Sequence, residues 1–334
     1  MGQRLVGSEV AANSIASGTN VASWALDSTW KGCGVKTCVI MNPHAGTADA
    51  NALREAIARL GDITLRTIQQ EGDGQRFASE ALADGSDLIV AAGGDGTINA
   101  VVNGLATDFG RARLGVIPMG SGNDFARTIH VPRDVDAALE VIVADVVQTV
   151  DVVRVTSNQV RYFISVSTGG FSGLVDERLT EELKRTWGPL AFLRSAAAAL
   201  PERTGYRTSV VFDDEASLDI QALNVIVANA KFAGRGIPIA PAAALDDGLA
   251  DVLIVPAASP AQLAILVPQI LLGKHLDSEL IVFRRARKLY VESHPGMWFS
   301  ADGELIGNEP VLFEVLPRAL RVVVGPDKAS QLGE

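Results

Sequence analysis

The 334-residue chain has little cysteine, few aromatic residues and no long hydrophobic run. Its two cysteines, Cys33 and Cys38, are too few for a disulfide framework, and their C-x4-C spacing is not a usual zinc pattern. The best candidate for a membrane-spanning helix, residues 261–272, contains Pro268 and two glutamines and falls short of the roughly 18 apolar residues required. The sequence therefore predicts neither a disulfide-rich domain nor an integral membrane protein.

Positive charge is also scarce, since 29 Lys and Arg against 39 Asp and Glu give a net charge of −10 at pH 7. A general nucleic-acid-binding protein needs a basic surface, so no nucleic-acid partner is expected. Residues 1–34 lack the basic cluster and apolar core of a signal peptide, and their small polar residues predict a flexible N-terminal extension. The 48% hydrophobic content predicts a folded chain, and its length favours two domains.

The first part of the chain alternates short apolar runs with stretches of helical periodicity. The predicted strands cover residues 35–41, 63–69, 87–92 and 113–117. The helices between them centre on residues 53–60, 77–82 and 98–105. This alternation predicts βαβ units, and hence an α/β domain with an open parallel sheet over residues 35–147.

Beyond residue 147 the alternation ends and strand-like segments dominate. They cover residues 147–156, 159–166, 206–212, 221–228, 250–255, 288–292 and 311–316, and helical insertions are expected at 172–199 and 260–274. The pattern predicts a β-rich, antiparallel, sandwich-like second domain over residues 148–317. A last strand near residues 318–326 is a candidate to return to the first domain.

Three loops rich in small residues follow predicted strands, at the sheet edge where open parallel sheets bind ligands. They are Asn42-Pro43-His44-Ala45-Gly46, Gly93-Gly94-Asp95-Gly96-Thr97 and Pro118-Met119-Gly120-Ser121-Gly122-Asn123-Asp124. Glycine lets the backbone approach an anion closely, and the helix after the second loop directs N–H groups at it. A carboxylate within such a loop, Asp95, is explained if it holds Mg²⁺ or handles a proton, whereas an ordinary tight turn is the alternative.

Two common nucleotide-binding motifs are missing from the sequence. It contains no G-x-x-x-x-G-K-[ST] motif, and the G-x-G that starts at Gly120 has Phe125 where a third glycine would complete G-x-G-x-x-G. A P-loop NTPase and an ordinary dehydrogenase are therefore disfavoured.

The motifs in combination resemble the diacylglycerol kinase catalytic domain family, which includes bacterial lipid kinases and sphingosine kinases. The resemblance covers residues 35–326 and is carried by Asn42-Pro43-x-x-Gly46, by residues 93–99 and 120–127, and by Ala301-Asp302-Gly303-Glu304. Segments 168–171 and 246–249 also match. Gly-Gly-Asp-Gly alone is shared with NAD kinases and phosphofructokinases, and the resemblance implies a first domain with the open sheet of those enzymes.

The resemblance implies an ATP- and Mg²⁺-dependent kinase that phosphorylates a hydroxyl of diacylglycerol or a related lipid. The implied catalytic residues are Glu304, as general base on that hydroxyl, and Asp95, which with Asp124 would organise Mg²⁺ and the phosphates. Without the resemblance, Asp302-Gly303 indicates a hairpin turn in which Glu304 is simply a solvated residue. The implied nucleotide-binding residues are Asn42, Pro43, His44, Ala45, Gly46, Gly94, Asp95, Gly96, Thr97, Ile98, Asn99, Ala100, Ser121 and Asp124. A further magnesium site is implied at Asp247, with Ala244 and Leu249.

The same resemblance implies a cytoplasmic protein that contacts the inner membrane surface transiently to reach its lipid. The basic run at residues 284–288 and the helical stretch 187–200 are candidate contact regions, against the simpler interpretations of a solvated edge and of core packing. The sequence identifies neither the lipid nor the role of the first 34 residues. Oligomeric state is also left open, with a homodimer as one option.

Two residues depart from the family pattern. Ala100 stands where glutamate is usual, and Ile68 stands where relatives carry a threonine that contacts the nucleotide. These departures leave two alternatives open beside the lipid kinase. One is a catalytically weakened, nucleotide-binding regulatory protein, and the other is a kinase of a soluble acceptor such as NAD.

Overall fold

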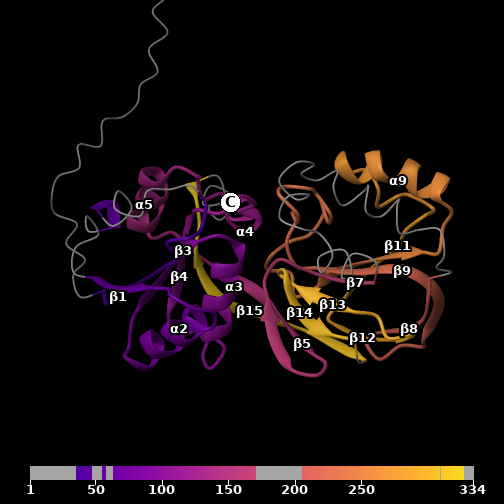
Figure 1. Ribbon diagram of the computed structural model, residues 1–334, viewed down its shortest axis with the longest axis horizontal. Helices are drawn as coiled ribbons and strands as arrows, with labels where there is room; N and C mark the ends of the chain where they lie inside the picture. Colours follow the sequence, from indigo (N-terminus) through magenta and orange to yellow (C-terminus); the bar gives the residue numbers. More distant parts are fainter. Residues whose placement is uncertain (1–34, 47–54, 58–62, 171–204, 309, 327–334) are drawn as a thin grey trace, which may run out of the picture. The chain divides into compact units, whose positions relative to one another are not determined.

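The fold is seen in a computed structural model, which describes residues 35–46, 55–57, 63–170, 205–308 and 310–326 (Figure 1). The predicted N-terminal extension, most of the predicted helix at 53–60 and the predicted helical insertion at 172–199 lie outside these residues. The rest of the molecule consists of an α/β half and a β-rich half, which confirms the predicted fold class.

The α/β half contains four neighbouring parallel strands in the order β2-β1-β3-β4. They are β1 (Thr37–Met41), β2 (Ile63–Thr67), β3 (Leu88–Gly93) and β4 (Arg113–Pro118). The helices are α2 (Asp73–Ala83), α3 (Asp95–Gly104), the short α4 (Asp124–Thr128) and α5 (Val135–Ala144). Helix α5 was not predicted, although Asp136 and Glu140, one helical turn apart, lie on an exposed face and Ala138, Leu139, Val141 and Ile142 are buried.

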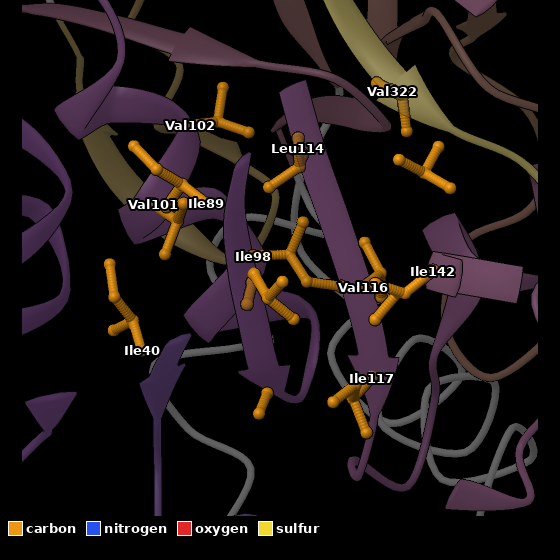
Figure 2. Packing of buried hydrophobic residues seen from close by; sticks show 14 of the residues in the cluster. Ile40, Ile89, Ile98, Val101, Val102, Leu114, Val116, Ile117, Ile142 and Val322 are labelled. Carbon is orange, nitrogen blue, oxygen red and sulfur yellow. The ribbon is translucent and has the colours of Figure 1, made fainter. Parts of the chain in front are cut away.

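Helices cover the faces of this sheet, so its strands are buried. All six residues of β3 are buried, as expected for a central parallel strand. Figure 2 shows Ile89 and Val116 from the sheet together with Ile98 of α3 and Ile142 of α5 in one apolar cluster. Cys38 of β1 is 2% exposed, so it is a small core residue, and burial raises the pKa of its thiol.

The β-rich half is antiparallel, as predicted. Its strands are β5 (Val147–Thr156), β6 (Val160–Phe163), β7 (Val166–Gly170), β8 (Tyr206–Phe212), β9 (Leu218–Ala228), β10 (Ala250–Pro256), β11 (Val282–Ala286), β12 (Lys288–His294), β13 (Phe299–Ala301), β14 (Glu304–Gly307) and β15 (Val311–Val323). Helix α9 (Pro260–Leu271) packs Leu263, Leu266 and Ile270 into an apolar cluster with residues of β9 and β10.

The long strand β15 belongs to both halves. Its first residues pair antiparallel with β12, whereas Arg321 and Val322 pair parallel with β4. Strand β5 runs antiparallel beside it, with an irregularity between Leu316 and Leu320. The strands of the two halves therefore join in one hydrogen-bonded sheet.

One predicted strand is wrong. The predicted strand 159–166 is broken after Phe163, because the N–H groups of Ile164 and Ser165 bond to a carboxylate instead of a neighbouring strand. The basic run at residues 284–288 is largely exposed, as the interpretation of a solvated edge expects, since Arg284, Arg285 and Arg287 are exposed. Its first three residues belong to β11, where Arg285 binds Asp251 and the next residue is buried.

Candidate functional site

The three predicted loops meet at one edge of the parallel sheet. They follow β1, β3 and β4, which are adjacent and parallel, so their carboxyl ends lie side by side. A side-chain hydrogen bond of 3.3 Å joins the first loop to the second, from Asn42 Nδ2 to Thr97 Oγ1. The convergence expected from the sequence is therefore present in the fold.

The loops approach one another too closely for most side chains. A Cβ atom placed on Gly46 would lie 2.0 Å from the carbonyl oxygen of Met119, and one on Gly120 would lie 2.6 Å from the Cα of Gly94. Real Cβ contacts are never this short, so these two positions require glycine. The backbone segments of the three loops therefore lie in direct contact at this edge of the sheet.

Helix α3 begins directly at these loops. Its N-cap residue, Gly94, is extended and supplies no side-chain hydrogen bond to the first turn. The N–H groups at a helix start carry partial positive charge and need an acceptor from outside the helix. A phosphate group placed against Asp95 and Gly96 would satisfy them.

Asp95 shares this site with a second carboxylate. Its Oδ1 accepts a hydrogen bond of 3.3 Å from the N–H of Phe125, and burial together with the charge of Asp124 raises its pKa. A Cβ on Gly122 would lie 2.9 Å from Asp95 Oδ2 and 3.5 Å from Asp124 Oδ2. Both oxygens therefore face the space that Gly122 leaves open.

A pair of close carboxylates suits a divalent cation, because the cation offsets their mutual repulsion. Mg²⁺ is commonly held by one or two carboxylates together with phosphate oxygens and water. Asp95 and Asp124 fit that donor set. Among the described residues, no group of three or more His, Cys, Asp or Glu side chains is placed to hold a metal ion, so phosphate oxygens would have to complete the site.

Asp124 also ties the third loop to the β-rich half. Its carboxylate accepts hydrogen bonds from the N–H groups of Arg235, at 3.0 Å, and Gly236, at 2.6 Å. One helical turn later, the guanidinium of Arg127 lies 5.7 Å from the ring centre of Phe232. Sequence reasoning missed this partner segment, for which the Gly-Arg-Gly run was the available indication.

The remaining predicted nucleotide-binding residues fall into two groups. His44, Gly96 and Ser121 are exposed, and Pro43, Ala45 and Gly94 are partly exposed at the loops. Ile98 is 1% exposed and Asn99 is 6% exposed, so their side chains lie inside the protein. A ligand at the loops would meet the first group more readily than the second.

The two departures from the family pattern lie together. A Cβ on Gly74, at the start of α2, would lie 3.0 Å from the Cβ of Ala100 and 3.4 Å from the Cδ1 of Ile68. Both residues thus line the same small apolar contact. The two departures therefore alter the contact at Gly74 and do not replace Asp95 or Asp124.

The Asp-Gly-Glu motif forms the turn of the β13–β14 hairpin. Asp302 and Gly303 have φ values of 47° and 88°, the left-handed pair that a tight hairpin turn requires. Glu304 follows at the start of β14, and its side chain is exposed. Within the described residues its carboxylate has no hydrogen-bond or ion-pair partner, so it is available to another group.

Asp302 lies two residues before Glu304, but its carboxylate is hydrogen-bonded within the protein, whereas that of Glu304 is exposed. Its carboxylate accepts hydrogen bonds from the N–H groups of Ile164, Ser165 and Val166 and from the amide of Asn99. Burial raises its pKa to about 6, while these hydrogen bonds act in the other direction. Sequence reasoning gave Asp302 no role beyond its place in the motif, although Asp-Gly did indicate a turn.

The second predicted metal site is arranged differently from the expectation. Asp247 accepts a hydrogen bond of 3.0 Å from the N–H of Leu249, and its other oxygen is paired with Arg285, which also binds Asp251 at 2.9 Å. The guanidinium supplies the positive charge that a metal ion would bring. Magnesium binding by Asp247 with Ala244 and Leu249 stays a prediction, in which the ion would compete with Arg285 for the carboxylate.

Comparison with known families covers most of the chain. Residues 36–155 match the family described as the diacylglycerol kinase catalytic domain. Residues 164–324 match the family described as the YegS C-terminal NAD kinase beta sandwich-like domain. The two matches correspond to the α/β half and the β-rich half.

Individual proteins with similar sequences and structures agree with this. The chain is 34% identical to a diacylglycerol kinase of Bacillus subtilis over 79% of its own length and 86% of the relative's. It is 31% identical to one of Staphylococcus epidermidis, over 86% and 92% respectively. A crystal structure of a diacylglycerol kinase from Bacillus anthracis superposes with a TM-score of 0.74 at 25% identity, covering 88% of this chain and 98% of that one.

Proposed function

Because the chain belongs to the diacylglycerol kinase family, we propose that it transfers the γ-phosphate of ATP to a hydroxyl of a diacylglycerol-like lipid. The observation that carries the proposal is the meeting of three loops at the start of α3, with Asp95 and Asp124 facing one space. Phosphoryl transfer needs positioning and charge stabilisation more than covalent chemistry from the protein.

In this proposal the loop backbone and the N-terminus of α3 bind the phosphates of ATP. Asp95 and Asp124 hold Mg²⁺, which offsets the negative charge of the phosphates when bound. Asp124 keeps its carboxylate oriented through Arg235 and Gly236. The protein's part is thus to fix the γ-phosphate in one place.

Glu304 accepts the proton of the lipid hydroxyl. Its carboxylate is exposed and unpaired among the described residues, so an incoming hydroxyl finds it accessible. The neighbouring Asp302 is hydrogen-bonded to Asn99, which lies on the same helix as Asp95. This hydrogen bond connects the turn that carries Glu304 to α3, the helix that begins at the phosphate-binding loop.

The direct test is incubation of the purified protein with γ-labelled ATP, Mg²⁺ and a total lipid extract, followed by identification of the labelled product. Glu304→Gln is expected to lower transfer by about a hundredfold or more, since general base catalysis contributes on that scale. Binding of ATP should be unchanged. Glu215→Gln, at another exposed glutamate, is the matched control and should transfer normally.

Two results would contradict the proposal in different ways. Near-normal transfer by Glu304→Gln would remove Glu304 as the base. Magnesium-dependent ATP binding by the wild type without transfer to any lipid would instead indicate a regulatory protein. The contact of Ala100 and Ile68 at Gly74 leaves the three proposed carboxylates intact, which favours an active kinase.

The proposal includes transient contact with a lipid surface. Helix α9 carries no charged residue, and beyond its buried face Ile265 is 60% exposed, Leu271 41% and Leu272, its C-cap, 70%. Exposed aliphatic side chains on such a helix suit insertion at a membrane interface. None of the described helices combines the length and apolar character needed to cross a bilayer.

Sedimentation with phosphatidylglycerol vesicles tests this contact. The double change Ile265→Asp and Leu272→Asp should weaken vesicle binding about tenfold, because aspartate opposes burial among acyl chains. Val143→Asp changes a valine of α5 that is 41% exposed, and it should leave vesicle binding unaltered. Equal binding by the double variant and the wild type would exclude α9 as the contact.

A further inference from the structure

We propose that Asn99 and Asp302 form a positioning pair that holds the Asp-Gly-Glu turn against helix α3 and so sets where Glu304 stands relative to the phosphate-binding loop. The inference rests on the proposed function for its catalytic consequence. Its structural part, the dependence of the turn on Asn99, does not.

Asp302 is held first by its own half of the molecule. Its Oδ2 accepts a hydrogen bond of 3.0 Å from the N–H of Ile164, and its Oδ1 accepts bonds of 3.1 and 3.0 Å from Ser165 and Val166. Three successive backbone N–H groups that point at one carboxylate form a concave anion site. The backbone N–H of Asp302 in turn donates to the carbonyl of Val166, at 3.0 Å. The turn is thereby fixed to the connection between β6 and β7.

Asn99 supplies the bond to the other half. It lies four residues after Asp95, which places the two on the same side of α3. Its Nδ2 donates to Asp302 Oδ2 and to the carbonyl of Tyr162, each at 3.1 Å, and its Oδ1 accepts from Asn103 Nδ2 at 3.1 Å. Because the side chain is buried and its donors are used within the protein, Asn99 positions the turn instead of contacting the nucleotide.

Within the described residues, the bond between Asn99 and Asp302 is the one hydrogen bond that joins this turn to α3. A separate connection joins α3 to β6, since Asn103 accepts from the N–H of Tyr162 at 3.0 Å and donates to its carbonyl at 2.8 Å. Loss of the Asn99 amide therefore removes the direct bond between the turn and α3, while the turn keeps its bonds to the β6–β7 connection and α3 keeps its own contact with β6. Asn103 offers a matched control, because it is also a buried asparagine on the same helix.

The first test is kinetic and compares Asn99→Ala with Asn103→Ala. Asn99→Ala should lower kcat at least tenfold while the Kd for ATP changes less than twofold, because the loop that binds the phosphates is untouched. Asn103→Ala should lower kcat less than threefold. An unchanged kcat in Asn99→Ala, or equal losses in the two variants, would overturn the proposal.

The second test asks whether the pair acts through Glu304. Measured on the residual transfer of Glu304→Gln, the added change Asn99→Ala should cost less than twofold, since the position of the absent carboxylate no longer matters. If Asn99→Ala costs the same factor in both backgrounds, it acts independently of Glu304 and the proposal fails.

The third test needs no enzymatic activity. Backbone hydrogen exchange of residues 300–308 should be at least tenfold faster in Asn99→Ala than in the wild type, and near wild type in Asn103→Ala. Faster exchange in a protein that phosphorylates no lipid would support the pair and refute the proposed function. Unchanged exchange would refute the pair, whatever the activity.

Discussion

Both halves of the molecule have a glycine that the candidate site depends on, but for different reasons. In the α/β half, Gly120 is required by space, because a Cβ there would lie 2.6 Å from the Cα of Gly94. In the β-rich half, Gly303 has a φ of 88°, and a Cβ there would meet no atom within 4 Å. The phosphate loops thus depend on contact between distant segments, whereas the Asp-Gly-Glu turn depends on local backbone conformation.

The acidic residues differ in the same way. Asp95 and Asp124 both approach the space at Gly122, and burial together with the charge of Asp124 raises the pKa of Asp95, so a cation there would relieve the repulsion between them. Asp302 is instead satisfied by neutral amide donors. We therefore expect the first pair to respond to a ligand and Asp302 to respond mainly to changes in the protein itself.

The largest loss of stability is expected at Gly120, where a side chain would clash with a neighbouring loop. Gly120→Ala should lower the free energy of unfolding by about 2 kcal/mol, because the added methyl group forces two backbone segments apart. Urea denaturation measures this loss. Gly96→Ala is the control, since a Cβ there would meet no atom within 4 Å and alanine favours a helix, so its stability should equal or exceed that of the wild type. Equal stability of Gly120→Ala and Gly96→Ala would remove the contact argument.

A smaller effect is expected from the charge of Asp302. Its pKa of about 6 in the folded protein exceeds the usual 3.8, so the folded state binds more protons between these values and stability falls as pH rises through them. When the pH is lowered from 7.5 to 5, one unit below this pKa, protonation of Asp302 should raise the free energy of unfolding by about 1.4 kcal/mol. In Asp302→Asn that increment disappears, while other titrating groups are common to both proteins. Parallel pH profiles of the two proteins would show that the pKa is not raised.

The smallest effect is expected where glycine is required by conformation alone. Gly303→Ala should lower the free energy of unfolding by about 1 kcal/mol, the cost of a left-handed alanine. Gly303→Asn should lose less, since asparagine tolerates this conformation better. Thermal unfolding of both variants measures the difference. A loss as large as that of Gly120→Ala would mean that a side chain at Gly303 meets a contact after all.

Much of the fold was predictable because it depends on local pattern. The alternation of apolar runs with helical periodicity predicted β1 to β4 and that they run parallel, and Asp-Gly predicted a hairpin turn. The strand at residues 159–166 could not be divided correctly, because its break depends on the carboxylate of Asp302, more than 130 residues away. Strand β11 was missed because its sequence, Val-Phe-Arg-Arg-Ala, does not alternate between apolar and polar residues and its pairing partner, β10, is distant in sequence.

The same division applies to the site. The sequence by itself determined which residues have the chemistry for phosphoryl transfer, since glycine loops, paired carboxylates and an Asp-Gly-Glu element are visible as residue types at fixed spacing. Only the tertiary structure decided that Asn99 faces Asp302, that Asp124 binds the N–H groups of Arg235 and Gly236, and that Asp247 is paired with Arg285. Hydrogen bonds form between atoms close in space, and the spacing of residues along a chain does not specify which distant segments the fold brings together.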